Sequence, residues 1–120
     1  MKLFHSIHAA TRGIRYVFSH EQNFRIQLSI GFLVFWAGVF FRLSRNEIIV
    51  ILWLILFILV LELVNSAVEK FMDIVKPRLS MHVEITKDIM AGVVFLASCG
   101  AALIGIIIFF PHVIEFFVSP

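Results

Sequence analysis

The stretch IIVILWLILFILVLELVNSAVEKFMDIV, residues 48 to 75, decides the fold of this chain. It begins with an unbroken apolar run from Ile48 to Leu61 and continues, without Pro or Gly, into a segment that carries charge. Since a membrane-crossing helix needs about 20 mostly apolar residues, this pattern predicts one helix that starts inside a bilayer and extends beyond it. We expect the helix to end near Pro77, because proline lacks the N–H that continues a helix.

The charged half of this stretch carries four regularly spaced polar residues, Glu62, Asn65, Glu69 and Asp73. Their separations of three, four and four residues place them on one face of an α-helix. Carboxylates inside or at the edge of a membrane are energetically costly and usually have a function or a partner. The resulting stripe of three carboxylates and an amide is therefore the first candidate for a functional site.

The composition is that of a membrane protein. Apolar residues make up 61% of the 120 residues and charged residues 15%, whereas a soluble domain is about half apolar and a quarter charged. We predict a single all-α domain over residues 1–120, with membrane spans at about 26–41, 47–75 (including an extension beyond the bilayer) and 88–111. A polar connection, residues 76–87, joins the last two spans, and Pro111 marks the far end of the third span or a kink near it. Ala97, Ala101 and Gly105 form a small-residue stripe that suits close helix packing.

Residues 3–20 predict an amphipathic helix on the membrane surface. Leu3, Ile7 and Ile14 fall at helical spacing, while Arg12 and Arg15 mostly fill the other side. An ordinary amphipathic helix packed on other protein is the alternative. We expect no cleavable signal in residues 1–10, because they contain no unbroken apolar run.

The placement of lysine and arginine predicts the orientation of the chain. With three spans, one side holds eight of these ten residues: Lys2, Arg12, Arg15, Arg25, Lys70, Lys76, Arg78 and Lys87. The other side holds only Arg42 and Arg45. The positive-inside rule then places the N-terminus and the acidic stripe on the cytoplasmic side of a bacterial cytoplasmic (inner) membrane. The formal net charge of +2 is too small to imply nucleic acid as a partner.

Polar groups from several helices are expected to meet at this cytoplasmic level: the acidic stripe, Glu21, and Lys87 with Asp88. This set suits phosphoryl transfer, which uses carboxylates to hold Mg²⁺, a lysine to neutralise charge and a base to accept a proton. The sequence contains neither a GxxxxGK[ST] nor a GxGxxG phosphate loop.

Three other interpretations of the same residues stay open. The stripe could join helices in a non-enzymatic assembly factor, or it could form the proton or cation site of a small ion-coupled transporter subunit. Lys87 and Asp88 could be a snorkelling pair at the start of a helix. The five histidines do not form a convincing set of metal ligands, although His5 and His8 lie one turn apart.

The segment ELVNSAVE, residues 62–69, resembles the E-x-x-N-[ST]-A-[IV]-E signature of the prokaryotic diacylglycerol kinase and undecaprenol kinase family. The acidic Asp73 fits the position that follows the signature, and the family's K-D pair matches Lys87 and Asp88. Upstream, EQNFRI at residues 21–26 resembles the family's E-x-N-F-R-I segment. These anchors occur in order, and the resemblance covers essentially the whole chain.

The resemblance implies a homotrimer of three-span protomers that transfers the γ-phosphoryl group of MgATP to a lipid hydroxyl. The acceptor would be diacylglycerol, giving phosphatidic acid, or a polyprenol such as undecaprenol. The implied catalytic residues are Glu62, as the base, and Asn65 beside it; the implied metal ligands are Glu21 and Glu69. The implied nucleotide contacts are Glu21, Glu69, Asp73, Lys87 and Asp88, and the implied lipid contacts are Glu62, Arg25 and Ala91.

The chemistry of the residues agrees with these roles. Glu62 is the most deeply embedded acid of the stripe, where a lipid hydroxyl would arrive, whereas Glu69 lies two turns further out, towards a water-borne cation. At Gln27 the chain departs from both types of the family, since many undecaprenol-type members carry His there and diacylglycerol-type members carry Glu. In the 76–86 loop it departs from the diacylglycerol-type pattern at Arg78 and Ser80. The segment IMAG, residues 89–92, is closer to the undecaprenol type, so both lipid acceptors stay open.

Overall fold

A computed structural model describes residues 1–75 and 80–119 of the chain. In this part of the chain all regular structure is helical: α1 (Lys2–His20), α2 (Gln22–Phe40), α3 (Arg45–Val75) and α4 (Ser80–Val118). Among the described residues, α2, α3 and α4 are long and apolar enough to cross a membrane. The predicted all-α architecture, with one amphipathic helix followed by three spans, is confirmed.

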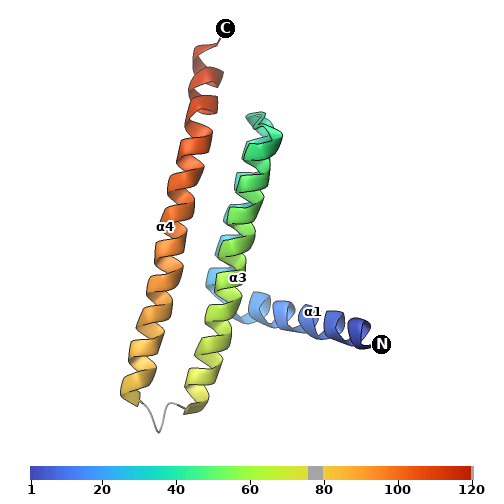
Figure 1. Ribbon diagram of the computed structural model, residues 1–120, viewed down its shortest axis with the longest axis vertical. Helices are drawn as coiled ribbons and strands as arrows, with labels where there is room; N and C mark the ends of the chain where they lie inside the picture. Colours follow the sequence, from blue (N-terminus) through green and yellow to red (C-terminus); the bar gives the residue numbers. More distant parts are fainter. Residues whose placement is uncertain (76–79, 120) are drawn as a thin grey trace.

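The helices are arranged around α3. Figure 1 shows α3 and α4 running side by side, with α2 largely behind α3, and α1 projecting sideways from the bundle. Helix α3 packs against both α2 and α4, whereas α1 touches α2 and α3 only through its end. A helix at a steep angle to three spans is the geometry expected of a surface helix.

Two glycines bring α2 close to α3. Gly31 and Gly38 are buried, and a Cβ added at Gly31 would lie 2.8 Å from Cγ2 of Ile55. A Cβ at Gly38 would lie 3.1 Å from Cδ1 of Ile48. The missing side chains therefore allow these two helices to approach more closely than larger residues would permit.

Most other apolar side chains of the spans remain exposed within one copy of the chain, such as Leu96 on α4, which is 75% exposed. No residue in the most hydrophobic 18-residue stretch of α4 is buried. In a soluble protein so much exposed apolar surface would be unstable, but it suits contact with lipid or with neighbouring helices.

The turn between α2 and α3 is held by local hydrogen bonds. Arg42 has a positive φ of 58°, and the N–H of Leu43 donates to the carbonyl of Gly38 at 3.0 Å. Leu43 itself is buried. These features make a left-handed C-terminal cap on α2, with arginine at a position that usually carries glycine.

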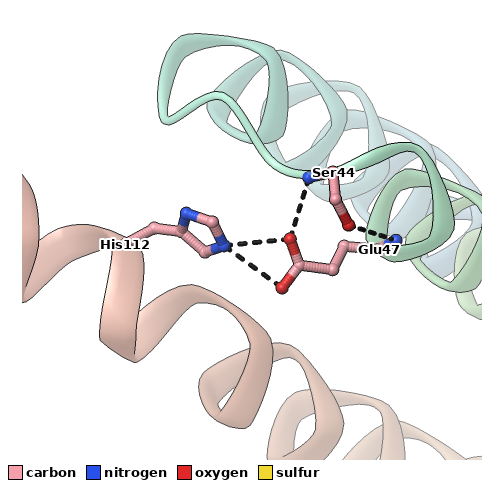
Figure 2. Close-up of polar contacts among 3 residues, drawn as sticks. All are labelled: Ser44, Glu47 and His112. Atoms are coloured by element: carbon pink, nitrogen blue, oxygen red, sulfur yellow. Dashed lines mark hydrogen bonds and ion pairs between the residues drawn. The ribbon is translucent and has the colours of Figure 1, made fainter.

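A polar cluster ties this turn to α4 (Figure 2). The N–H of Ser44 donates to Oε1 of Glu47 at 2.8 Å, and the N–H of Glu47 donates to Oγ of Ser44 at 3.3 Å, which is a capping box at the start of α3. His112 on α4 places Nε2 at 2.9 and 3.1 Å from the two carboxylate oxygens of Glu47. The contact links residues far apart in the sequence, because the start of α3 lies beside the last part of α4 (Figure 1).

Helix α4 differs from the sequence prediction at both ends. The prediction of a polar connection through Lys87 was wrong for residues 80–87, which are helical. This segment lacks Pro and Gly, and its Val83 is buried while its neighbours are mostly exposed, so it forms an amphipathic first part of the helix. The rest of the predicted connection, residues 76–79, lies outside the described residues.

At the other end, α4 continues through Pro111 to Val118. A proline inside a helix removes one hydrogen bond but can be tolerated where tertiary contacts hold both sides. Here the centroid of the Phe116 ring lies 5.6 Å from that of Phe40 and 5.7 Å from that of Phe41. These contacts and the His112–Glu47 pair attach the last turns of α4 to the α2–α3 turn.

Candidate active site

Glu62 lies on the inner face of α3, near the level at which α1 leaves the bundle. It is only 4% exposed, and Ser66, one turn along the same face, is 6% exposed. A buried carboxylate is costly unless it has a partner or a function. Its charge is also repelled by the carboxylates of Glu21 and Glu69, which lie close enough to interact with it electrostatically.

Asn65 and Glu69 pair on the same helix. Nδ2 of Asn65 donates to Oε1 of Glu69 at 3.3 Å, one helical turn away, and both side chains are partly buried. This contact holds one oxygen of the Glu69 carboxylate and leaves the other able to accept a ligand. The stripe predicted from the sequence therefore exists as a face of α3.

Lys87 brings α4 into the same group of residues. Its Nζ lies 3.0 Å from Oδ1 of Asp73, and the two side chains are 35% and 63% exposed. A pair this exposed contributes little stability. The contact does, however, bring together two of the residues predicted to contact nucleotide.

Glu21 occupies the corner between α1 and α2. Its backbone is extended, with φ −111° and ψ 111°, and it is at once the C-cap of α1 and the N-cap of α2. Its side chain is partly buried, and it interacts electrostatically with Glu62 on α3. The sharp corner thus brings an acid from the start of α2 to the acidic face of α3.

The remaining predicted site residues are less closely grouped. Arg25 donates from its guanidinium to the carbonyl of Phe18 at 2.6 Å, so it caps the carboxyl end of α1. Asp88 and Ala91 are exposed on α4. The predicted loop position Arg78 lies outside the described residues.

The acids of this face could bind a cation that has some of its coordination positions occupied by other ligands. Among the described residues, no group of three or more His, Cys, Asp or Glu side chains is arranged as a complete metal site. Mg²⁺ is commonly held by one or two carboxylates together with substrate phosphates, and it prefers oxygen ligands. Glu69, whose second carboxylate oxygen has no hydrogen-bond partner among the described residues, and Glu21 are the pair that fits this pattern.

Two contacts of the structure were not predicted from the sequence. Lys70 lies over the ring of Tyr16, with Nζ 4.6 Å from the ring centroid, and joins α3 to α1. No periodic pattern indicates that pair, because it joins two helices. The Glu47–His112 pair was also missed, although the S-x-x-E spacing of Ser44 and Glu47 could have predicted the capping box within it.

Comparison with known proteins gives two relatives. A diacylglycerol kinase of Synechocystis sp. is 30% identical over 115 residues, which covers 94% of this chain and 65% of the relative. This chain thus spans about two thirds of that protein's length. An undecaprenol kinase of Bacillus subtilis is 30% identical over 115 residues, covering 92% of this chain and 89% of the relative. No solved structure matches significantly.

The family model for prokaryotic diacylglycerol kinase matches residues 8–109. The match includes Glu21, the acidic face of α3 and the Lys87–Asp88 pair, and it extends over most of all four helices. By this match, and by two curated relatives that are both named as lipid kinases, the chain belongs to the prokaryotic diacylglycerol kinase family.

Proposed function

We propose that this chain is an ATP-dependent lipid kinase that transfers the γ-phosphoryl group of ATP to the hydroxyl of diacylglycerol, giving phosphatidic acid. The observation that carries the proposal is the burial of Glu62 on the helical face that also presents Asn65 and Glu69. A family match alone would leave the reacting residues undefined. The structure adds that Glu62 is nearly inaccessible to solvent, whereas Glu69 and Asp73, further along the same face of α3, are partly or fully exposed.

Glu62 is the proposed general base. A base in phosphoryl transfer accepts the proton of the attacking hydroxyl, and it must lie where that hydroxyl arrives. Glu62 is the most deeply embedded acid of the stripe and is buried, so it lies where the hydroxyl of a membrane lipid would arrive. Asn65 acts indirectly, because its amide holds the Glu69 carboxylate one turn away.

Glu21 and Glu69 are the proposed ligands of a Mg²⁺ ion that accompanies ATP. When bound, the ion would neutralise charge on the phosphates. Lys87 would meet the nucleotide from α4 as a point charge, with Asp73 orienting its ammonium group through the 3.0 Å contact. Asp88 lies next to Lys87 on an exposed part of the same helix and is a further proposed nucleotide contact.

An apolar cavity supports a lipid acceptor. A cavity of about 480 Å³ lies between α2, α3 and α4, which is within the usual range for small-ligand sites. One of its lining residues, Ile58, lies one turn before Glu62 on α3, and Gln27 lines it from α2. An acyl or prenyl chain in this cavity would keep its attached hydroxyl near Glu62. Arg25 and Ala91 stay proposed contacts for the lipid head.

Undecaprenol is the second candidate acceptor, with the same mechanism. Two observations favour it: the chain covers 89% of the undecaprenol kinase relative, and residues 89–92 read IMAG. The proposed setting for either reaction is a homotrimer in the bacterial cytoplasmic membrane, with the N-terminus and the acidic face on the cytoplasmic side. This orientation follows from the excess of lysine and arginine at that end.

The test is phosphate transfer from radiolabelled MgATP by the purified protein in mixed micelles, with diacylglycerol and undecaprenol offered in parallel. We expect label in one of the lipids and a loss of at least about 100-fold in Glu62→Gln, since a general base contributes roughly that much or more. Glu62→Gln keeps the size of the side chain, so its elution volume in gel filtration should match that of the wild type.

Two results would count against the proposal. An active Glu62→Gln enzyme would remove the base assignment. Absence of label in both lipids, combined with proton flux in proteoliposomes that depends on Glu62, would favour an ion-coupled transporter subunit instead.

A further inference from the structure

Helix α1 is attached to the bundle by few contacts. Of its residues, only Val17 is buried, and side chains at its start, such as Leu3 and Phe4, are about three-quarters exposed. The attachment lies in its last turns, where Arg25 also binds the carbonyl of Phe18. The place of Glu21, which directly follows α1, relative to α3 therefore depends on a small set of interactions.

One of these interactions is a stack of three side chains. Nζ of Lys70 lies 4.6 Å from the centroid of the Tyr16 ring, which is within cation–π range. The Tyr16 ring in turn stacks on His20, with centroids 4.1 Å apart and an angle of 18° between the rings. His20 is further held by Nδ1, 2.9 Å from the carbonyl oxygen of Tyr16.

The stack connects the two elements that carry the proposed metal ligands. Lys70 is the neighbour of Glu69 on α3, and His20 is the neighbour of Glu21 at the end of α1. Lys70 also interacts electrostatically with Glu21 and with Asp73. Its ammonium group therefore attracts the acid at the corner towards α3, while its contact with the Tyr16 ring joins α3 to the last part of α1.

We propose that Lys70 and Tyr16, supported by His20, are positioning residues that set Glu21 opposite Glu69 so that the two carboxylates can share one divalent cation. The inference rests on the proposed function for the identity of that cation. It adds residues outside the acidic stripe that act through Glu21, without touching substrate themselves.

The test measures metal binding directly. Mn²⁺ replaces Mg²⁺ as a paramagnetic cation with the same preference for oxygen ligands, and its binding is followed by electron paramagnetic resonance with a non-hydrolysable ATP analogue present. A cation–π contact at an exposed site corresponds to roughly a two- to fivefold change in an equilibrium constant. We therefore expect Tyr16→Leu and Lys70→Met to weaken Mn²⁺ binding by about this factor.

Matched variants separate the stack from a general loss of charge or of packing. Lys70→Arg keeps a cation that can lie over the Tyr16 ring, so it should bind Mn²⁺ as the wild type does. Arg45→Met removes one positive charge at the other end of α3 and should also leave binding unchanged. At saturating Mg²⁺, the turnover of Tyr16→Leu should stay within about twofold of the wild type, because the inference concerns metal affinity.

Hydrogen–deuterium exchange of α1 in the same micelles shows whether the attachment itself has loosened. Faster exchange in Tyr16→Leu and Lys70→Met, with unchanged Mn²⁺ affinity, would mean that the stack only anchors the helix, and the inference would fall. Unchanged exchange and unchanged affinity would overturn it as well. If the wild type transfers no phosphate but the variants still lose Mn²⁺ affinity, the kinase proposal fails while the positioning role stands.

Discussion

At the scale of single residues, the candidate site consists of acids whose surroundings differ. Glu62 is almost completely buried, Glu69 has one oxygen held by Asn65, and Asp73 is exposed and paired with Lys87. This gradient follows from the helix itself, since each turn moves a side chain about 5.4 Å along its axis. In the proposed function, this face of α3 would accept a proton at its inner end and hold cations further out.

The proposed roles of Glu62 as base and of Glu21 and Glu69 as metal ligands predict different kinetic defects when each is replaced. Glu69→Gln and Glu21→Gln should raise the Mg²⁺ concentration needed for half-maximal activity, because an amide is a weaker cation ligand than a carboxylate. Glu62→Gln should lower kcat at any Mg²⁺ concentration. Titration of activity with Mg²⁺ in each variant checks this. A normal Mg²⁺ requirement in both Glu69→Gln and Glu21→Gln would contradict the metal assignment.

Arg42 provides a residue-scale prediction about stability. Its φ of 58° is unfavourable for any residue with a Cβ, and glycine adopts it freely. Arg42→Gly should therefore stabilise the protein by about 1 kcal/mol, and thermal unfolding in micelles would reveal it as a higher midpoint. Arg42→Ala, which keeps the Cβ, serves as the control. A midpoint for Arg42→Gly below that of the control would show that the side chain matters more than the backbone.

At the scale of helices, the sequence predicted the elements better than their ends. Long apolar runs predict spans because the bilayer requires them, and the acidic stripe follows from helical period alone. The start of α4 at Ser80 and its passage through Pro111 depend instead on tertiary contacts, those of Val83, His112 and Phe116. Local patterns contain no information about such contacts, and for the same reason the Tyr16–Lys70 pair was not predicted.

The packing of α2 on α3 can be tested at Gly31. A methyl group there would meet Ile55 at 2.8 Å, closer than two carbon atoms can approach. Gly31→Ala should destabilise the protein by roughly 1–3 kcal/mol, the usual cost of overpacking. Ile55→Ala removes the opposing methyl group and should recover part of the loss in the double variant.

Gly100→Ala is the matched control, because a Cβ at Gly100 would meet no atom within 4 Å in the described part of the chain, apart from the backbone of its own helix. It should be neutral or slightly stabilising, as alanine favours helix over glycine. Unfolding in mixed detergent, followed by circular dichroism, compares the variants. Equal stability of Gly31→Ala and Gly100→Ala would indicate that the α2–α3 contact tolerates extra volume.

At the scale of the whole molecule, the proposed function requires one orientation in the membrane. ATP is present in the cytoplasm, so Glu21, Glu69 and Lys87 must face that side, and α1 must lie on the same surface. The excess of lysine and arginine at this end agrees with that orientation. The opposite end, with the Ser44–Glu47–His112 cluster and the last turns of α4, would then face away from the cytoplasm (Figure 2).

Cysteine labelling in spheroplasts tests this orientation, starting from a Cys99→Ser background that removes the one native cysteine. Ser6 on α1 and Ser119 beyond α4 are both exposed and can each be replaced by cysteine. A maleimide that cannot cross membranes should label Ser119→Cys in intact spheroplasts and Ser6→Cys only after lysis. The reverse pattern would place the acidic face of α3 away from ATP, and no arrangement of Glu62, Glu69 and Lys87 could then perform the proposed reaction.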